Sequence, residues 1–259
     1  LNYEISNFGK PWVSILNGIA MGGGLGLSVH GSHRIISEKT MAAMPETAIG
    51  LFPDVGGGYF LSRMENSLGV YLALTGNIID ADNAIHSGIG TNLLENKLVK
   101  NFIDNFLKLE NYTINEVDNL LTRYDNKKHI NPTFKNENDY INDNFSSESI
   151  QEIFENLEKD KSDWSSKHLD VLRKKSPTSM AVALKQLTLS KHMNLKDCLS
   201  MEFRICQAMM GKNDFYEGVR ANLVDKDRSP NWKPKTVFDL TSNIVDDHFL
   251  ELKEKELFI

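Results

Sequence analysis

Three consecutive glycines, Gly22-Gly23-Gly24, constrain the fold of this chain more than any other feature. The apolar run at residues 12–16 precedes them, is rich in β-favouring residues and is typical of a buried strand. Residues 25–29 continue with apolar side chains in a helical context, and residues 34–37 are typical of a second short strand. Because a strand, a glycine turn, a helix and another strand form a βαβ unit, we expect an α/β fold here.

The glycine turn is also suited to binding a negatively charged group. Glycines at the N-terminus of a helix leave backbone N–H groups uncovered, and the helix dipole adds a partial positive charge that suits a phosphate or an oxyanion. The dinucleotide-binding pattern fails because Leu27 and Val29 stand where later glycines would be, and no P-loop lysine follows. From the glycines alone, a tight packing turn between strand and helix explains the sequence equally well.

A second candidate feature is the segment from Met44 to Gly58, which is almost devoid of charge except for Glu46 and Asp54. Apolar surroundings raise the pKa of a carboxyl group, and a carboxyl with a pKa near neutrality can move protons. The alternative is that both are ordinary loop acids, with Asp54 capping the glycine-led helix that follows. Two acids in such a frame modestly favour a catalytic role.

These motifs resemble the crotonase superfamily and, within it, the 3-hydroxyisobutyryl-CoA hydrolases. The run Ala20–Leu27, followed by Met44-Pro45-Glu46, is similar to the crotonase signature. The segment 44–61, MPETAIGLFPDVGGGYFL, is similar to the hydrolases nearly residue for residue. Residues 214–221, 225–227 and 229–234 are similar to them as well. The resemblance extends over essentially all 259 residues. It implies a crotonase-like spiral of ββα units with a C-terminal α-helical region, the family's N-terminal third lying outside this sequence.

The resemblance also implies roles for individual residues. Gly23 matches the crotonase glycine whose N–H binds the thioester oxygen, with Gly22 beside it as a candidate substrate contact, and the second N–H donor belongs to the N-terminal third of the family. Glu46 matches the catalytic acid/base. Gly26 stands where hydratases carry a second catalytic glutamate, which disfavours a two-glutamate hydration mechanism. Asp54 matches an acid that the hydrolase subfamily shares.

Thioester hydrolysis of an acyl-CoA is therefore the predicted reaction, and the family implies neither a metal nor a redox cofactor. Glu46 either activates water or attacks the carbonyl to form an anhydride that water resolves, and the sequence leaves both routes open. Asp54 is expected to orient the substrate hydroxyl, the water or Glu46 itself. Lys226 and Arg228 are candidates to bind the CoA phosphates, although a solvated charged turn explains them at least as well.

The composition argues against several other classes of protein. A net charge of −6 gives no sign of a nucleic-acid or anionic-membrane surface, and no apolar run reaches the roughly eighteen residues that span a bilayer. Cys198 and Cys206 lie too far apart in one predicted helix to form a disulfide. His30 and His33 come nearest to a metal pair. Without an acidic or cysteine partner close in sequence, we expect them to be surface histidines on a helix.

The rest of the chain is predicted to be largely helical. Apolar residues recur at helical spacing over residues 97–107 and 114–124. Candidate helix starts are Asp80, a capping box at Ser149-Ile150-Gln151-Glu152, the Ser176-Pro177 pair, Asn194 and Asn213.

The chain is expected to divide into three parts. Residues 1–125 form the C-terminal part of the crotonase core. Residues 126–147, rich in Asn, Asp and Lys, form a polar loop or linker, and residues 148–259 form a helical region that completes the same fold.

Two alternative functions stay open at this stage. One is a CoA hydratase or isomerase of the same fold, and the other is a structural subunit of the mitochondrial ribosome, to which some relatives of the hydrolases are similar. The intact set of Gly23, Glu46 and Asp54 favours the enzyme. The family implies release of 3-hydroxyisobutyrate and CoA in valine breakdown within the mitochondrial matrix. No targeting segment is recognisable in this sequence, and nothing in it indicates the oligomeric state.

Overall fold

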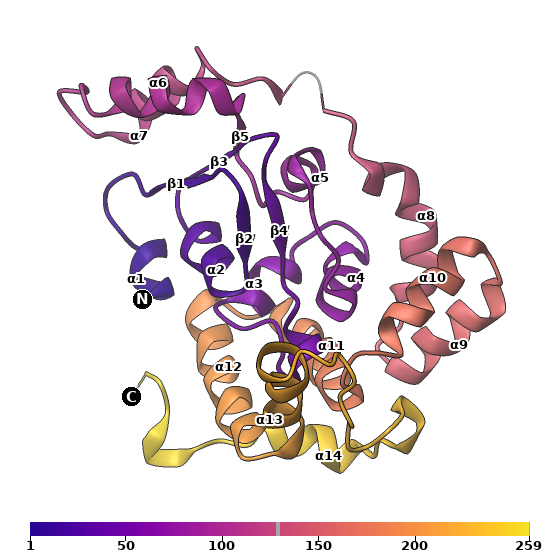
Figure 1. The fold of residues 1–259 in the computed structure, drawn as a ribbon. Helices are drawn as coiled ribbons and strands as arrows, with labels where there is room; N and C mark the ends of the chain where they lie inside the picture. The colour runs from indigo at the N-terminus through magenta and orange to yellow at the C-terminus, as the bar shows by residue number, and fades with distance from the viewer. Residues whose placement is uncertain (128–129, 259) are drawn as a thin grey trace. The chain divides into compact units, whose positions relative to one another are not determined.

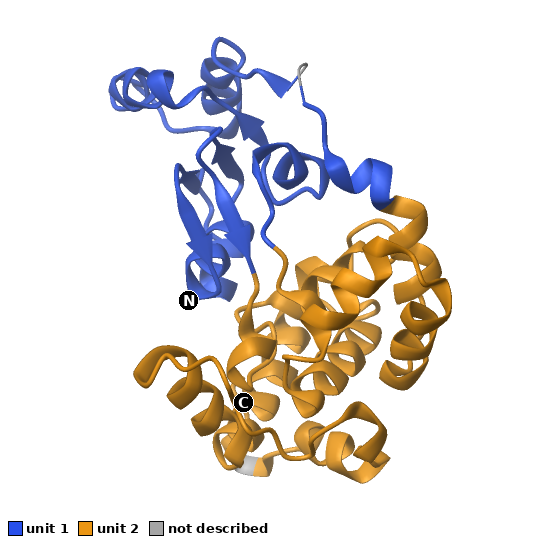
Figure 2. Cartoon of the chain, turned by 45° about the vertical axis from the view of Figure 1, so that its right-hand side comes forward, with its two compact units in different colours: residues 1–43, 78–137 blue, residues 44–77, 138–259 orange. Residues whose placement is uncertain are grey.

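The computed structural model describes residues 1–127 and 130–258, which form two compact units, each discontinuous in sequence (Figure 2). Unit 1 contains residues 1–43 and 78–137, and unit 2 contains residues 44–77 and 138–259. The segment 44–77, which carries Glu46 and Asp54, thus packs with the C-terminal helices. The division predicted from the sequence placed it with the first 125 residues.

Unit 1 is built on short parallel strands (Figure 1). One sheet has the order β1-β3-β5, formed by Val13–Leu16, His33–Ile36 and Asn92–Leu93. The other pairs β2 (Ile19–Met21) with β4 (Met41–Ala43), in a register that sets Met21 opposite Ala43. Helix α2 (Gly23–Val29) follows β2 directly and leads to β3, so the predicted α/β arrangement around the glycine turn is confirmed.

Four further helices belong entirely to unit 1, namely α1 (Asn2–Ser6), α5 (Ala81–His86), α6 (Asn96–Phe106) and α7 (Ile114–Leu121). Asp80 caps α5 as predicted, because its side chain accepts a hydrogen bond from the amide of Asn83. The amphipathic pattern of α6 and α7 buries Phe102, Val117, Leu120 and Leu121 against Ile35 and Leu94.

Helix α8 (Thr133–Phe145) corrects the prediction of a polar loop over residues 126–147. Its Asn- and Asp-rich sequence hides three apolar residues, Phe134, Ile141 and Phe145, whose spacing puts them on one side of a helix. All three are buried, and this burial outweighs the weak helix propensity of the polar residues between them. Residues 128 and 129 of the predicted loop lie outside the described residues.

Unit 2 is largely helical. Its long helices are α9 (Ile150–Asp160), α10 (Asp163–Leu172), α11 (Pro177–Ser190) and α12 (Leu195–Met210). Its shorter helices are η1 (Glu46–Ile49), α3 (Gly57–Leu61), α4 (Leu68–Thr75), α13 (Asn213–Val219), η3 (Arg220–Val224), η4 (Val237–Asp239), α14 (Ser242–Asp246), η5 (Asp247–Phe249) and η6 (Lys253–Lys255). Helix α11 is buried on nearly all sides and packs against α3 and α4, so it is the central element of this unit.

Most of the predicted caps are present, and two differ from expectation. Ser176 and Asn194 accept from the amides of Ser179 and Asp197. Ser149 likewise caps α9, but the carboxylate of Glu152 binds the hydroxyl of Ser147 at 2.6 Å, so the capping box is only half formed. Asn213 is the first residue of α13 rather than its cap, and Lys212 holds the cap position.

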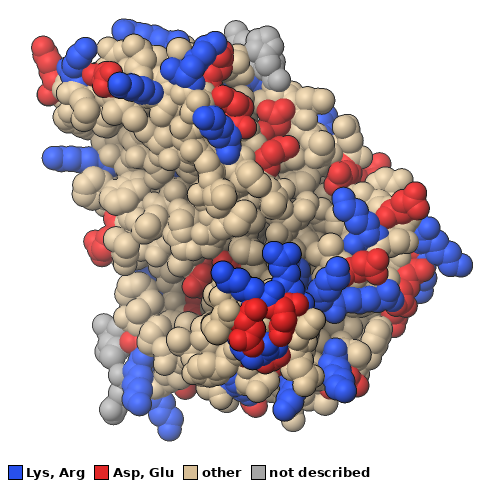
Figure 3. All heavy atoms as spheres, viewed as in Figure 1, with Lys and Arg blue, Asp and Glu red and all other residues tan. Residues whose placement is uncertain are grey.

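Three further observations concern the cysteines, the surface charge and the length of the apolar helices. Cys198 and Cys206 both lie on α12 and are free. On the face drawn in Figure 3, basic and acidic side chains are interspersed. In the part of the chain that the structure describes, no helix combines the length and apolarity needed to cross a membrane.

Candidate functional site

Glu46 begins η1, immediately after the Met44-Pro45 pair, and its side chain is only 6% exposed. The short helix is fixed through its backbone. The carbonyl of Glu46 accepts from Leu51, and the carbonyl of Thr47 accepts from the amide of Ser176 at the start of α11. Gly50 ends η1 with φ +70 and lies so close to Asp214 that an added Cβ would stand 2.2 Å from its carbonyl oxygen. This close approach explains why glycine occupies that position.

The carboxyl group of Glu46 is buried but not fully bonded. Its Oε2 atom has no hydrogen-bond partner among the described residues. Burial, with a smaller contribution from the negative charge of Asp54, raises the pKa of Glu46 to about 8, against the opposing effects of a backbone hydrogen bond and the ammonium of Lys175. A buried polar atom without a partner, on a group that titrates near neutrality, is typical of a catalytic acid/base.

Lys175 is the counter-charge that sequence reasoning missed. It follows α10. A Cβ added at Gly76 would stand 3.4 Å from Nζ of Lys175 and 2.9 Å from Cα of Pro45, the residue before Glu46. Burial lowers the pKa of Lys175 to about 8, against the opposing effect of the Glu46 charge. In the sequence Lys175 is one of two adjacent lysines, so nothing local distinguishes it.

Asp54 lies in the turn between η1 and α3, in the same unit as Glu46. The turn closes with a hydrogen bond from the amide of Gly57 to the carbonyl of Asp54 at 2.7 Å. Partial burial raises the pKa of the Asp54 carboxyl above its usual range. Its charge raises the pKa of Glu46, so the structure brings these two predicted residues together.

The turn that carries Asp54 is held by Glu202, a residue of α12 that is 4% exposed. Its two carboxylate oxygens accept from the amides of Gly56 at 2.7 Å and Gly58 at 2.9 Å. Burial raises the pKa of Glu202 to about 8, against the effect of these two hydrogen bonds. The capping role considered for Asp54 thus belongs to Glu202, which was not among the predicted site residues.

At the glycine turn, the structure separates the roles of the two candidate glycines. Gly22 has φ +51, and its N–H is already donated to the carbonyl of Ala43 at 3.1 Å. Gly23 is the first residue of α2, so its N–H lies beyond the reach of the intrahelical ladder. A Cβ added at Gly23 or Gly24 would meet nothing within 4 Å. Gly26 lies inside α2, and its carbonyl accepts from the side chain of Asn2 at 3.0 Å.

Lys226 and Arg228 lie in the exposed turn after η3, both with positive φ. This turn is organised by Arg220, which forms ion pairs with Glu217, Asp225 and Asp227 at 2.6–2.9 Å. The predicted role of Lys226 in CoA binding stays a prediction.

His33 corrects the expectation of two surface histidines on a helix. It lies in strand β3 with 3% exposure, and its ring nitrogens form hydrogen bonds with Ser32 at 2.8 Å and Asp118 at 3.2 Å. His30 ends α2. Across residues 1–127 and 130–258, no group of three or more His, Cys, Asp or Glu residues is arranged to hold a metal ion.

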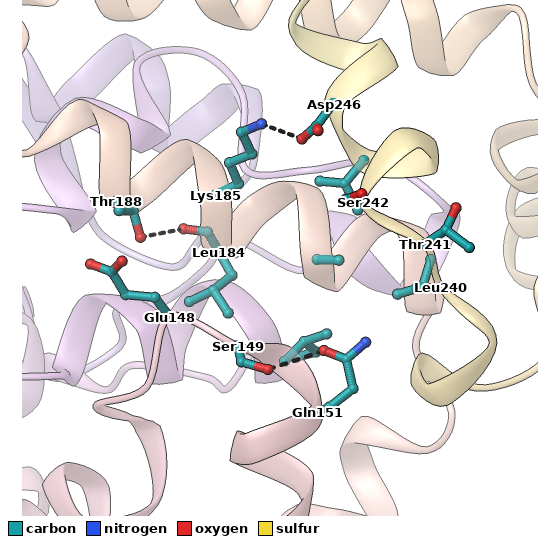
Figure 4. A pocket seen from close by; sticks show the side chains of 13 residues that line it. Glu148, Ser149, Gln151, Leu184, Lys185, Thr188, Leu240, Thr241, Ser242 and Asp246 are labelled. Atoms are coloured by element: carbon teal, nitrogen blue, oxygen red, sulfur yellow. Dashed lines mark hydrogen bonds and ion pairs between the residues drawn. The ribbon is translucent and has the colours of Figure 1, made fainter.

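Unit 2 also contains a cavity of about 390 Å³ that is not lined by Glu46, Asp54 or Glu202 (Figure 4). Helices α9 and α11 and the segment 240–246 line it, and Lys185 forms an ion pair with Asp246 at its edge. None of the predicted site residues contributes to this lining. A second cavity, of about 240 Å³, borders Gly50 and Phe215 near the end of η1.

Solved structures show that this architecture is the crotonase fold. The chain matches a carnitinyl-CoA dehydratase from Mycobacterium thermoresistibile with a TM-score of 0.90 and 30% identity, covering 99% of this chain and 72% of that one. It matches an enoyl-CoA hydratase from Rhodobacter sphaeroides with a TM-score of 0.89 and 31% identity, covering 100% of this chain and 73% of that one. The predicted fold class is therefore confirmed.

The family assignment is equally direct. The model of the enoyl-CoA hydratase/isomerase family matches residues 1–249, and the chain belongs to this family. It is 42% identical to the mitochondrial 3-hydroxyisobutyryl-CoA hydrolase of Danio rerio, 43% identical to that of Xenopus laevis and 41% identical to that of Homo sapiens. Each match covers 99% of this chain and 68% of the relative. The resemblance to these thioester hydrolases that the sequence predicts is confirmed.

Proposed function

We propose that this chain hydrolyses the thioester of 3-hydroxyisobutyryl-CoA to 3-hydroxyisobutyrate and CoA, with Glu46 as the acid/base or nucleophile. The observation that carries the proposal is the buried Glu46 carboxyl, with an unpaired Oε2 and a pKa near 8. Such a group is ready to accept and return a proton near neutral pH. The identity of 40% or more to hydrolases with this name supports the choice of substrate.

In the proposed reaction, Gly23 stabilises the charge that develops on the thioester oxygen. Its N–H stands at the start of α2, and removing one such donor typically costs about 10²–10³ in rate.

Asp54 is proposed to accept a hydrogen bond from the substrate hydroxyl. A partly buried carboxylate left without that partner would be penalised, so acyl groups that lack the hydroxyl would react more slowly. Gly26 supports hydrolysis over hydration, because no carboxylate side chain is available at that position.

Two routes to the same products remain within the proposal. In one, Glu46 takes a proton from water, the water oxygen bonds to the carbonyl carbon, the C–S bond breaks and the proton passes to the CoA thiolate. In the other, Glu46 itself attacks the carbonyl carbon and releases CoA, and water then cleaves the resulting anhydride. Single turnover in ¹⁸O-water tests the anhydride route, since attack of water on the Glu46 carbonyl carbon of the anhydride leaves ¹⁸O in the protein.

CoA release from 3-hydroxyisobutyryl-CoA by the complete polypeptide tests the proposal, with Glu46→Gln as the catalytic variant and the exposed Glu152→Gln as the matched control. We expect turnover in the wild type and the control, and a loss of at least about 10²-fold in Glu46→Gln. Hydration of an enoyl-CoA without thioester cleavage would instead identify the hydratase alternative. A folded protein with neither activity would favour the ribosomal-subunit alternative.

The setting of the reaction is part of the same proposal. The curated relatives are named as mitochondrial, which supports a place in the mitochondrial matrix and in valine breakdown. Fractionation of cells that express the complete polypeptide with a C-terminal tag tests the location. Recovery with a matrix marker is expected, and recovery only in the cytosol would contradict it.

A further inference from the structure

We propose that Glu202 is a positioning residue that fixes Asp54 and thereby sets the preference for a hydroxylated acyl group. This inference rests on the proposed function. It concerns a residue outside the predicted site, on a helix that begins about 140 residues after Asp54 in the sequence.

The turn around Asp54 is bonded on both sides by side chains from two different helices. Before Asp54, the carbonyl of Pro53 accepts from Nε2 of Gln186 on α11 at 2.9 Å. After it, the amides of Gly56 and Gly58 donate to Oε2 and Oε1 of Glu202 on α12. Gln186 also donates to Oε1 of Glu202 at 3.0 Å, so the two helices hold the turn as one network. These bonds fix the backbone on both sides of Asp54.

The backbone of the turn needs such support. Val55 has φ +53, and a β-branched residue rarely adopts positive φ, while Gly56 follows with φ +83. Unfavourable conformations of this kind persist only where the surrounding structure imposes them. The packing is equally tight at Gly58, where an added Cβ would stand 2.6 Å from Oγ of Ser190 and 2.9 Å from Nε2 of Gln186.

A carboxyl group suits this position better than an amide. The two oxygens of Glu202 meet three N–H donors, from Gly56, Gly58 and Gln186, and a carboxyl group presents two oxygens and no N–H group. An amide of the same size would turn an NH₂ group toward one of these donors. A helix start needs no distant buried acid for capping, because a local Ser, Thr or Asp serves. The long-range acid therefore points to a demand on the geometry of Asp54.

The test compares two substrates across a double-mutant cycle. Values of kcat/KM are measured for 3-hydroxyisobutyryl-CoA and for isobutyryl-CoA, which lacks the hydroxyl, in wild type, Glu202→Gln, Asp54→Asn and the double variant. We expect Glu202→Gln to lower the preference for the hydroxylated substrate about tenfold or more, and by less than about threefold once Asp54 is already Asn. Asp197→Asn, an exposed acid-to-amide change on the same helix, should leave the preference unchanged.

Several outcomes would overturn the inference. Equal losses on both substrates, or losses that add fully to those of Asp54→Asn, would reduce Glu202 to a support of the fold. If Glu202→Gln does not fold, Gln186→Met takes its place, because it removes the bonds to Pro53 and to Glu202 at nearly constant volume. An unchanged substrate preference in that variant overturns the proposal, and a reduced one supports it.

A crystal structure of Glu202→Gln separates this inference from the proposed function. Displacement of Asp54 and of the turn 53–58 supports the positioning role even if the wild-type protein releases no CoA, in which case only the proposed function fails. An unmoved Asp54 overturns the positioning role whatever the activity.

Discussion

Glu46 is buried and Lys175 is half-buried, and the charge of each favours the charged form of the other. Burial raises the pKa of the acid to about 8 and lowers the pKa of the base to about 8, so the two groups titrate in the same range of pH. Asp54 adds a negative charge that opposes the ionisation of Glu46. The protonation state of Glu46 thus depends on two neighbours of opposite sign.

Replacing Lys175 with Met removes the positive charge that lowers the pKa of Glu46. The pKa should rise above about 8, so the ascending limb of the pH–rate profile should move to higher pH. Near pH 7 we expect about three- to tenfold lower kcat/KM. The exposed neighbour provides the control, since Lys174→Met should leave the limb in place. An unshifted limb in Lys175→Met would show that the lysine does not influence the catalytic acid.

Asp54→Asn should move the same limb in the opposite direction. The change keeps the size of the side chain and removes the negative charge that raises the pKa of Glu46, so Glu46 should ionise at lower pH. The activity toward the hydroxylated substrate should fall about 10-fold or more even so, because the acceptor for the hydroxyl is weakened. A pH–rate profile of kcat/KM measures both effects, and a limb that moves to higher pH would contradict this account.

Stability should depend on pH through Glu46. The pKa of Glu46 in the folded state lies above its ordinary value of 4.5. The contribution of Glu46 to the free energy of unfolding is therefore fully present below about pH 4.5 and is lost as the pH rises through about 8. Between about pH 5 and pH 8, the free energy of unfolding should fall by about 3 kcal/mol more in wild type than in Glu46→Gln. Urea denaturation at a series of pH values measures the difference. Parallel curves for the two proteins would contradict the raised pKa.

Gly50→Ala should be destabilising for two reasons, and Gly88→Ala for one. Both glycines have positive φ, at +70 and +77, but an added Cβ at Gly50 meets the backbone of Asp214 whereas one at Gly88 meets nothing within 4 Å. We expect losses of about 3 kcal/mol or more at Gly50 and about 1 kcal/mol at Gly88. Thermal unfolding of the two variants isolates the cost of the contact, and equal losses would show that conformation alone matters.

Much of the fold follows from local sequence. The glycine turn between β2 and α2, and the caps at Asp80, Ser176 and Asn194, are short-range features whose physical causes lie within a few residues. Glu46 and Asp54 were recognisable for a similar reason, because acids are rare in an apolar Gly/Pro frame. Where local composition misled, as in the Asn-rich α8, the burial of a few apolar residues outweighed the propensities of their neighbours.

By itself, the sequence determined the crotonase class, the parallel strands around the glycine turn and the two acids of the candidate site. Only the tertiary structure decided what surrounds those acids. Lys175 and Glu202 lie roughly 130 to 150 residues from the acids they influence, and no local pattern encodes which buried groups will meet. Burial itself is a property of the packed chain. It raises the pKa of Glu46 and leaves its Oε2 unpaired, while hydrogen bonds to side chains of α11 and α12 hold the turn that carries Asp54.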